Sequence, residues 1–370
     1  MTILNLGPVC ALDQPVPGAG TRHERQIAAA DGLVVHDAES LNCETRPADL
    51  GGPVTPTARF FRRSHFPLPV LDRAEWRLAV GGLVDRPLRL SLPELTAMPA
   101  QTMAVTLECA GNGRARFEPP TPGVQWGPGA VGTAEWTGAR LADVLGRAGI
   151  RPDAREIIFT GADRGPVDEA PGQVRFERSL TVRDAVDSDA LLAYAMNGQP
   201  LPVRHGHPLR LVVPGWYAVA SVKWLTDIRL TADPFDGYFQ TSHYVRERAG
   251  AREPVRLQKV RYVITRPGDG QRFPVGALIV RGVAWSGAAP IARVEVSVAD
   301  GPWQKARLAG ATAPHGWQQW EFLAAGLGPG EARIRSRAAD LAGNVQPERP
   351  ERNRLGYEAN FVHEILVRLG

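Results

Sequence analysis

Glycine and proline place the tightest limit on what this chain can fold into. The sequence holds 39 glycines and 32 prolines among 370 residues. Glycine tolerates turn conformations that other residues avoid, and proline lacks the N–H that helices and central strands need. We therefore expect short strands joined by many turns, with few long helices. The length favours two domains, each large enough to bury a core of its own.

Composition and charge argue against several classes of protein. Hydrophobic residues make up 44% and charged residues 22% of the chain, which is typical of a globular protein in water. The net charge is +4, but the basic residues are scattered, whereas a nucleic-acid-binding protein concentrates them on one face. The sequence thus predicts no nucleic-acid partner. A small positive surplus is compatible with attracting a small anion.

No segment of the sequence has the features of a membrane span or a secretory leader. No run approaches the ~20 apolar residues that a transmembrane helix needs, and residues 1–14 lack a basic region followed by an apolar core. The three cysteines, Cys10, Cys43 and Cys109, have no metal-finger spacing, so no disulfide framework is expected. We expect no membrane association and a cytoplasmic location for the chain as given, or a periplasmic one if a leader has been removed.

The first 250 residues predict a mixed α+β domain. Residues 1–57 are rich in Gly, Pro, Asp and Ala and are expected to form loops. Ser91 and Glu94 have the spacing of a helix capping box, which predicts a short helix over residues 91–97. A second helix is expected to begin with residues 137–145, entered from a glycine turn. Alternating or β-rich runs predict strands at residues 76–84, 156–160 and 209–213.

The pattern changes after about residue 250, where turns rich in Gly, Pro and Asp separate short alternating runs. These runs are residues 260–265, 277–285, 291–298, 317–323 and 332–338. Such spacing over roughly 110 residues is typical of an immunoglobulin-type β-sandwich. Residues 252–254 are the expected linker. The expected domains therefore span residues 1–250 and 251–370.

One cysteine has a sequence context that indicates chemistry. Cys109 lies in Thr-Leu-Glu-Cys-Ala-Gly-Asn-Gly-Arg, residues 106–114. A strand is expected to end just before it, and residues 111–113 then force a turn. Arg114 and Arg116 follow closely enough to favour the thiolate. From the residues alone, Cys109 is a nucleophile, a soft-metal ligand or a small buried apolar side chain before a turn.

Four segments resemble, in the same chain order, motifs of the sulfite oxidase family. The cysteine run resembles Thr-Leu-x-Cys-Ala-Gly-Asn-Arg-Arg, and residues 60–67 resemble Phe-Phe-x-Arg-Asn-His-x-Pro. Residues 191–225 are similar to a third conserved stretch, and residues 353–356 are similar to a closing Trp-Asn-x-x-Gly element. Together these segments span most of residues 33–370.

The resemblance implies a molybdenum cofactor, in which an organic pterin supplies a dithiolene and the protein supplies one thiolate, that of Cys109. Arg210 and Lys223 would provide fixed positive charge for a buried phosphate. The positions that match cofactor contacts in the family are His65, Cys109, Asp163, His205, Arg210, Ser221 and Lys223.

The resemblance also implies a pocket for a small oxyanion, with sulfite as the expected substrate. The family's substrate positions fall on Arg63, Arg114, Trp126 and Tyr244. Arginine forks can bind the oxygens of the anion. The tryptophan would line the pocket, and the tyrosine hydroxyl would hydrogen-bond the anion.

The chain departs from the family's pattern at five positions in or beside these motifs. Two of the departures replace arginines, which lowers the number of arginines expected to bind the substrate. The five departures are Ser64 for asparagine, Gly113 for the first of two arginines, His207 for phenylalanine, His243 for an acidic residue and Leu355 for an arginine. Arg354 stands one place before the position where that last arginine is expected.

The fold that the resemblance implies is a sulfite-oxidase-like mixed α/β cofactor domain followed by a sandwich that forms a homodimer. The implied activity is oxidation of sulfite to sulfate, with electrons passed to an external acceptor: a cytochrome, another carrier or dioxygen. No Cys-x-x-Cys-His and no added segment with paired haem histidines is visible, so no haem is expected in this chain.

Three alternatives stay open. A related molybdenum enzyme would reduce nitrate or a sulfoxide in a different pocket. Without a metal, Cys109 would be a hydrolase nucleophile with His65, His205 or His243 as its base. A non-enzymatic chain would bind a protein partner through the faces of the sandwich, with no turnover and no bound pterin.

Overall fold

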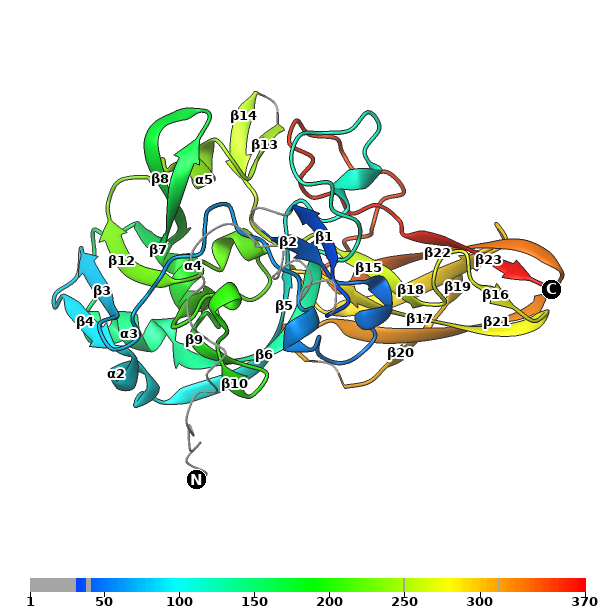
Figure 1. The fold of residues 1–370 in the computed structure, drawn as a ribbon, viewed down its shortest axis with the longest axis horizontal. Helices are drawn as coiled ribbons and strands as arrows, with labels where there is room; N and C mark the ends of the chain where they lie inside the picture. Colours follow the sequence, from blue (N-terminus) through cyan, green and yellow to red (C-terminus); the bar gives the residue numbers. More distant parts are fainter. Residues whose placement is uncertain (1–30, 38–40, 249, 312) are drawn as a thin grey trace.

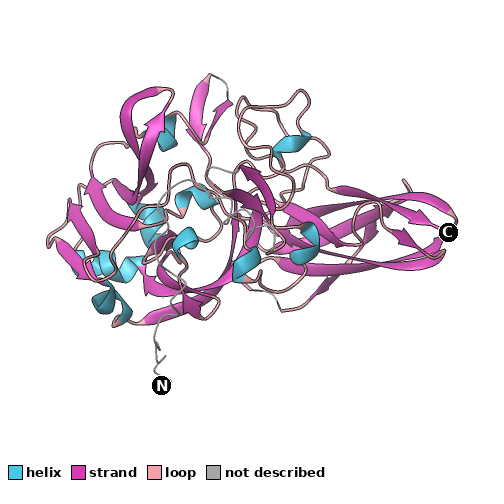
Figure 2. Cartoon of the chain, in the orientation of Figure 1, coloured by secondary structure: helices cyan, strands magenta, loops and turns pink. Residues whose placement is uncertain are grey.

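Strands dominate the regular structure of this protein (Figure 2). The computed structural model describes residues 31–37, 41–248, 250–311 and 313–370. Figure 1 shows two regions side by side, with the chain up to about residue 254 on the left and in the centre and the strands from residue 261 onward on the right. Cys10 and residues 1–30 of the expected N-terminal loop lie outside the described residues.

In the described chain, the first region contains two five-stranded sheets. The strands of one sheet are β5 (Ala100–Glu108), β6 (Val131–Arg140), β9 (Leu191–Met196), β10 (Gln199–Pro200) and β11 (Arg210–Val212). Its order is β10-β9-β6-β5, with β11 also paired to β9. The strands of the other are β3 (Arg77–Gly82), β4 (Leu88–Ser91), β7 (Glu156–Val167), β8 (Ala170–Thr181) and β12 (Leu225–Thr231), in the order β4-β3-β12-β7-β8. Only the β3–β12 pair in these two sheets, as described, is parallel.

Two hairpins complete the described strands of the first region. The first joins β1 (Val34–Asp37) to β2 (Asn42–Glu44) inside the segment that was expected to form loops. The second joins β13 (Val245–Arg248) to β14 (Ala251–Pro254), so the expected linker residues 252–254 belong to a strand.

The described α-helices are short, from four to eight residues. They are α2 (Leu92–Thr96), α3 (Leu141–Ala148), α4 (Val182–Asp187) and α5 (Tyr238–Thr241). The predicted capping box is confirmed: Ser91 Oγ accepts from the Glu94 N–H, and the Glu94 carboxylate accepts from the Ser91 N–H. The helix expected from residue 137 begins only at Leu141, because residues 137–140 continue β6 and pair with β5 and β9.

Among the described residues, no helix is both long enough and apolar enough to cross a membrane.

The second region is built from two sheets that pack on one core. The strands of one sheet, in the order β15-β17-β21-β20, are β15 (Arg261–Arg266), β17 (Gly276–Trp285), β20 (Arg307–Ala309) and β21 (Gln318–Leu327). The strands of the other, in the order β16-β23-β22-β18-β19, are β16 (Arg272–Phe273), β18 (Ile291–Val298), β19 (Gln304–Lys305), β22 (Gly330–Asp340) and β23 (Glu364–Leu369). Each of the five strand-like runs predicted from the sequence overlaps one of these strands, and two of them, residues 260–265 and 317–323, begin one residue too early.

Alternation explains the packing of the second region. Along β23, exposed and buried residues follow each other strictly, as expected of a strand with one face on a core. The shared core includes Tyr262, Val280, Val296, Trp320 and Ile334, all of them almost completely buried. The described fold is richer in sheet than the α+β mixture that the sequence led us to expect.

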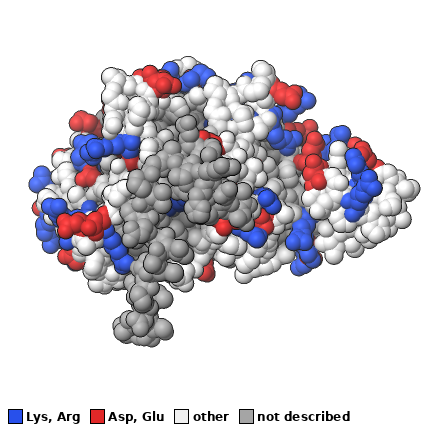
Figure 3. Space-filling model, in the orientation of Figure 1, with Lys and Arg blue, Asp and Glu red and all other residues white. Residues whose placement is uncertain are grey.

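The visible surface carries both signs of charge. On the face drawn in Figure 3, basic and acidic side chains are interspersed over the described residues. Oppositely charged side chains of neighbouring strands form pairs, such as Arg307 with Glu321 at 2.6 Å and Arg337 with Glu295 at 2.8 Å. Surface pairs of this kind contribute about 0–1 kcal/mol each to the free energy of unfolding, so they add little to the stability of the fold.

The two regions meet at the end of β5. Gln258 Nε2, just before β15, donates to the Thr106 carbonyl oxygen at 3.0 Å. The Thr106 N–H donates to the carbonyl oxygen of His315 at 2.9 Å. The segment that leads into Cys109 is therefore held from both regions.

Candidate active site

Cys109 directly follows β5 and opens a tight turn. Its N–H donates to the Ala130 carbonyl oxygen at 2.9 Å, and its own carbonyl oxygen accepts from the Asn112 N–H at 2.9 Å. Gly113 closes the turn with φ of +81°, a left-handed conformation that favours glycine. The side chain is 5% exposed and lines a pocket. The predicted strand-then-turn arrangement is confirmed.

The charges around the thiol differ in part from the expectation. Burial raises the pKa of Cys109, while Arg63, the Gly111 backbone and Arg114 act to lower it. Arg116, expected to favour the thiolate, instead donates to the Val362 carbonyl oxygen in the second region. The expectation for Arg116 is therefore wrong, because its side chain contacts the second region and not the thiol. A bound soft metal would stabilise the thiolate more directly than these neighbours do.

Most of the predicted residues converge on one pocket. The space between its lining side chains, part of it open to solvent, measures about 690 Å³. Nine predicted residues line it: Arg63, His65, Cys109, Asp163, His205, Arg210, Ser221, Lys223 and Tyr244. They come from segments that are up to 181 residues apart in the sequence. Cys109 directly follows β5, Asp163 lies within β7, and Arg210 begins β11.

Arg210 is a buried cation without an acidic neighbour in the described structure. It is 4% exposed, and burial alone lowers its pKa to about 9. Its Nη1 donates to the His205 carbonyl oxygen at 3.0 Å and its Nη2 to that of Ser221 at 3.1 Å. The guanidinium carbon lies 4.7 Å from the centre of the Trp136 ring. A guanidinium held only by neutral groups is suited to an anion that the chain does not itself supply.

Lys223 and Asp163 form the other charged part of this pocket. Lys223 Nζ donates to the Arg63 carbonyl oxygen at 2.8 Å and to Ser64 Oγ at 2.9 Å. Burial lowers the pKa of Lys223, and the nearby Asp163 carboxylate opposes that fall. Burial raises the pKa of Asp163, whose Oδ1 is buried without a hydrogen-bond partner. An orphaned acceptor that lines the pocket calls for a donor from a bound group.

His205 and Ser221 contribute polar atoms to the same pocket. Burial lowers the pKa of His205 well below its ordinary value, helped by Arg62 and Arg210, so its ring is neutral at pH 7. Ser221 Oγ accepts from the Val213 N–H at 3.0 Å. A neutral imidazole has one donor and one acceptor nitrogen, which suits recognition of a pterin edge.

Arg63, His65 and Tyr244 form a connected set beside Cys109. His65 Nε2 and Tyr244 Oη are hydrogen-bonded at 2.6 Å. Arg63 Nη2 lies 3.0 Å from both His65 ring nitrogens. Burial, followed by the charge of Arg63, holds the pKa of His65 well below its ordinary value. The imidazole is thus neutral and can hydrogen-bond the tyrosine without adding charge.

A second pocket, of about 890 Å³, adjoins the first through Arg63, Cys109 and Tyr244. It also contains the two remaining predicted residues, Arg114 and Trp126. All eleven residues that the sequence analysis singled out therefore lie around these two connected spaces. Their individual roles stay predictions.

Arg114 is fixed by its surroundings. Its Nε donates to the Leu355 carbonyl oxygen at 2.9 Å and its Nη1 to that of Val124 at 3.0 Å. A Cβ at Gly111 or Gly123 would lie 2.7 or 2.8 Å from its guanidinium nitrogens, so a side chain at either position would displace the guanidinium. Such packing holds the side chain in one orientation beside the pocket.

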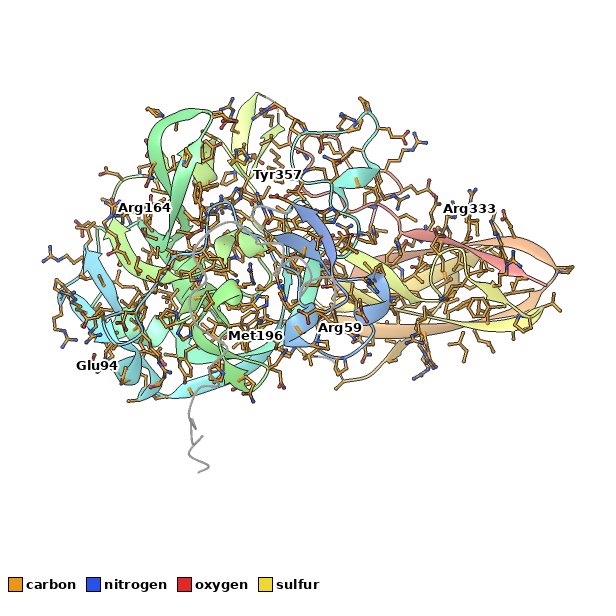
Figure 4. The ribbon with its side chains drawn as sticks, in the orientation of Figure 1. Arg59, Glu94, Arg164, Met196, Arg333 and Tyr357 are labelled. Carbon is orange, nitrogen blue, oxygen red and sulfur yellow. The ribbon has the colours of Figure 1, made fainter. Side chains whose placement is uncertain are left out.

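Sequence reasoning missed several residues of the site. Tyr357, labelled in Figure 4, stacks on the Tyr244 ring with centroids 5.0 Å apart and lies under Arg114 at 5.1 Å. Its position directly after the residues 353–356 motif is the signal that could have found it. Glu169, beside His243 at the second pocket, had no comparable sequence signal.

The donor set fits a metal carried by an organic cofactor. Among the described residues, no three His, Cys, Asp or Glu side chains gather as they would around a metal held by the protein alone. A single thiolate, a buried cation and an orphaned carboxylate oxygen instead match one protein ligand plus an anionic, polar group.

Comparisons with known proteins agree with this geometry. Residues 65–239 match the family described as oxidoreductase molybdopterin binding domain, and residues 253–370 match the Mo-co oxidoreductase dimerisation domain. Chicken (Gallus gallus) sulfite oxidase is 36% identical over 341 residues, which cover 86% of this chain and 73% of that protein. Rice (Oryza sativa subsp. japonica) nitrate reductase [NADH] 1 is 35% identical over 88% of this chain and 40% of its own length.

A solved structure extends the agreement to the whole fold. The sulfane dehydrogenase SoxCD from Paracoccus pantotrophus superposes with a TM-score of 0.81 and 27% identity. The match covers 98% of this chain and 92% of that one. The architecture is therefore sulfite-oxidase-like, and the chain belongs to the sulfite oxidase family of molybdopterin-binding oxidoreductases.

Proposed function

We propose that this enzyme oxidises sulfite to sulfate with a molybdenum cofactor and passes the electrons to an external acceptor. The observation that carries the proposal is one buried cysteine on a glycine turn, facing a pocket that also holds Arg210, a buried cation whose guanidinium is held by carbonyl oxygens and an aromatic ring. Sulfite takes up one oxygen from water and releases two electrons and two protons. When bound, the cofactor supplies the oxygen-atom transfer and the two-electron redox change.

The proposed cofactor site uses each polar group of the first pocket. The Cys109 thiolate would bind the metal, since a soft sulfur ligand suits a transition metal that changes oxidation state. Arg210 and Lys223 would bind the phosphate, because fixed buried cations bind anions most strongly. His65, Asp163, His205 and Ser221 would bind polar atoms of the pterin.

The proposed substrate site lies where the two pockets meet. Arg63 and Arg114 would bind the oxygens of sulfite, and Tyr244 would donate its hydroxyl hydrogen to the same anion. Trp126, 1% exposed, would exclude water from this side. Because the arginines are already held by carbonyl oxygens, they need little rearrangement to receive the anion.

The proposed organisation divides the chain into two units. Residues 1–250 would form the cofactor domain, and residues 251–370 would form an immunoglobulin-like sandwich through which two copies pair. Support comes from the shared core of the two sheets after residue 261 and from the match to a dimerisation domain. Two-fold homodimers are the commonest closed assemblies.

A second candidate function keeps the cofactor and reduces nitrate or a sulfoxide. It is favoured by Leu355, which lines the second pocket with an apolar side chain where the family has an arginine. The neighbouring Arg354 lines the same pocket, but its charge is paired with the Glu247 carboxylate at 3.1 Å. The substrate space is thus less cationic than the resemblance alone implies.

One set of assays separates these functions. Purified protein is assayed for molybdenum content, for sulfite-dependent reduction of ferricyanide, and for reduction of nitrate or methionine sulfoxide with a reduced dye. The proposal expects about one molybdenum per chain and turnover of sulfite. Absence of molybdenum, or turnover of nitrate or the sulfoxide without turnover of sulfite, would contradict it.

A further inference from the structure

A buried carboxylate lies directly behind the cysteine turn. Glu108 is the last residue of β5 and is 1% exposed. Neighbouring residues of a strand point to opposite faces, and Glu108 faces the second region while Cys109 faces the pocket. Its Oε1 accepts from Arg261 Nη1 at 3.1 Å, and its Oε2 accepts from Trp285 Nε1 at 2.8 Å. Both donors come from the other sheet region, from β15 and β17.

The same arginine also holds the backbone of the turn. Arg261 Nη1 donates to the Asn112 carbonyl oxygen at 2.8 Å. A Cβ at Gly113 would lie 2.4 Å from Arg261 Nη2 and 2.8 Å from the Ala359 carbonyl oxygen. A side chain at position 113 would therefore collide with the Arg261 guanidinium. Glycine at this position leaves room for Arg261 to reach the turn.

Asn112 connects this ion pair to the backbone beside the thiol. Its Nδ2 donates to Glu108 Oε1 at 3.0 Å, and its Oδ1 accepts from the Ala130 N–H at 3.1 Å. The Ala130 carbonyl oxygen in turn accepts from the Cys109 N–H at 2.9 Å. A continuous set of hydrogen bonds thus runs from β15 to the cysteine.

We propose that Glu108 and Arg261 are a positioning pair, through which the second sheet region fixes the Cys109 turn in the orientation that binds molybdenum. This inference rests on the proposed function. It gives β15, a strand of the second region, a role in positioning the metal ligand of the first region. Removing one charge of the buried pair leaves the other charge buried without a partner. The turn then loosens, so the protein retains less molybdenum and the metal's surroundings change.

The test uses the holoenzyme and two conservative variants, Glu108→Gln and Arg261→Lys. Glu108→Gln keeps the shape and removes the charge, and Arg261→Lys keeps the charge and removes the planar fork. Arg368→Met is the matched control, because Arg368 forms a strand-to-strand pair with Glu331 in which both side chains are more than half exposed. The readouts are molybdenum retained during dialysis, the electron paramagnetic resonance spectrum of the reduced enzyme, and thermal unfolding.

We expect both variants to lose molybdenum at least fivefold faster than wild type and to shift the resonance spectrum, while the control matches wild type. Retention at the wild-type rate with an unchanged spectrum would overturn the inference, even if the variants unfold at a lower temperature. That outcome would mean that the pair holds the regions together without positioning the metal ligand.

A milder variant decides the matter if neither conservative variant folds. Trp285→Phe removes one donor to Glu108 and strands no charge, so we expect a roughly twofold faster loss of molybdenum; wild-type retention in this variant would overturn the inference. Wild-type protein without molybdenum would contradict the proposed function and the inference together. Wild-type retention in the variants contradicts the inference alone.

Discussion

Replacing Arg210 with methionine should separate cofactor binding from folding. The side chain is buried, and its guanidinium is held by the carbonyl oxygens of His205 and Ser221 and by the Trp136 ring. The substitution keeps an unbranched apolar side chain of similar length and removes the charge. Cofactor-free protein, made in a host that cannot synthesise the pterin, and cofactor-loaded protein are compared.

Two opposing effects nearly cancel in the cofactor-free protein. Burial lowers the pKa of Arg210 from 12.5 to about 9, which is equivalent to about 5 kcal/mol spent on holding the charge. Leaving the two carbonyl oxygens unpaired costs about 1–3 kcal/mol each, and losing the contact with the ring costs about 1 kcal/mol. We therefore expect the free energy of unfolding to stay within about 2 kcal/mol of wild type.

Cofactor binding should fall much further. A buried cation that loses its anionic partner, or the reverse, changes the free energy by about 3–5 kcal/mol. Cofactor content of Arg210→Met should therefore fall to a small fraction of wild type. The assays are denaturant unfolding of the cofactor-free protein and molybdenum and pterin content of the loaded protein. Arg89→Met, at an exposed position of β4, is the matched control.

The reasoning fails if Arg210→Met keeps the wild-type cofactor content. It fails equally if the cofactor-free variant loses far more than about 2 kcal/mol of stability, since Arg210 would then be a structural residue whose charge costs little.

Three further perturbations test separate contacts. Tyr244→Phe removes the hydroxyl bonded to His65 at 2.6 Å, so sulfite turnover should fall roughly tenfold, as measured by steady-state kinetics; an unchanged kcat/KM would refute this. Gly113→Ala places a Cβ at positive φ in contact with a guanidinium and should lower the melting temperature far more than Gly172→Ala, which has positive φ but open space; equal losses would count against it. Burial lowers the pKa of His363 to about 4. Because the unfolded chain binds the proton first, stability should decline as pH falls from about 6.5 to 4, by about 2–3 kcal/mol. His363→Asn should flatten that decline in urea unfolding, and an equally steep decline would refute the assignment.

Local patterns were enough to predict much of the fold. Alternating runs predicted β15, β17, β18, β21 and β22, because these strands pack on a shared core. The sequence analysis missed the short strands β16, β19 and β20, and also β23, although β23 alternates strictly. The Ser91–Glu94 capping box is a local interaction and was read correctly. The helix expected from residue 137 was placed too early, since residues 137–140 pair with β5 and β9, and such pairing between distant segments overrides local preference.

The site divides along the same line. Residues that a motif brings together, such as Cys109 and Arg114, were found from the sequence. The Glu108–Arg261 pair was not, because its members are 153 residues apart and each reads as an ordinary strand residue. Arg116 shows the reverse error: it is near Cys109 in sequence, but the turn directs it to the second region.

The central claim is that the sulfur of Cys109 binds molybdenum, and X-ray absorption at the molybdenum edge tests it most directly. Wild type and Cys109→Ser are compared after pterin analysis has shown that both retain the cofactor. We predict that the variant has one fewer sulfur neighbour around the metal than wild type. The same number of sulfur neighbours in both proteins would contradict the account.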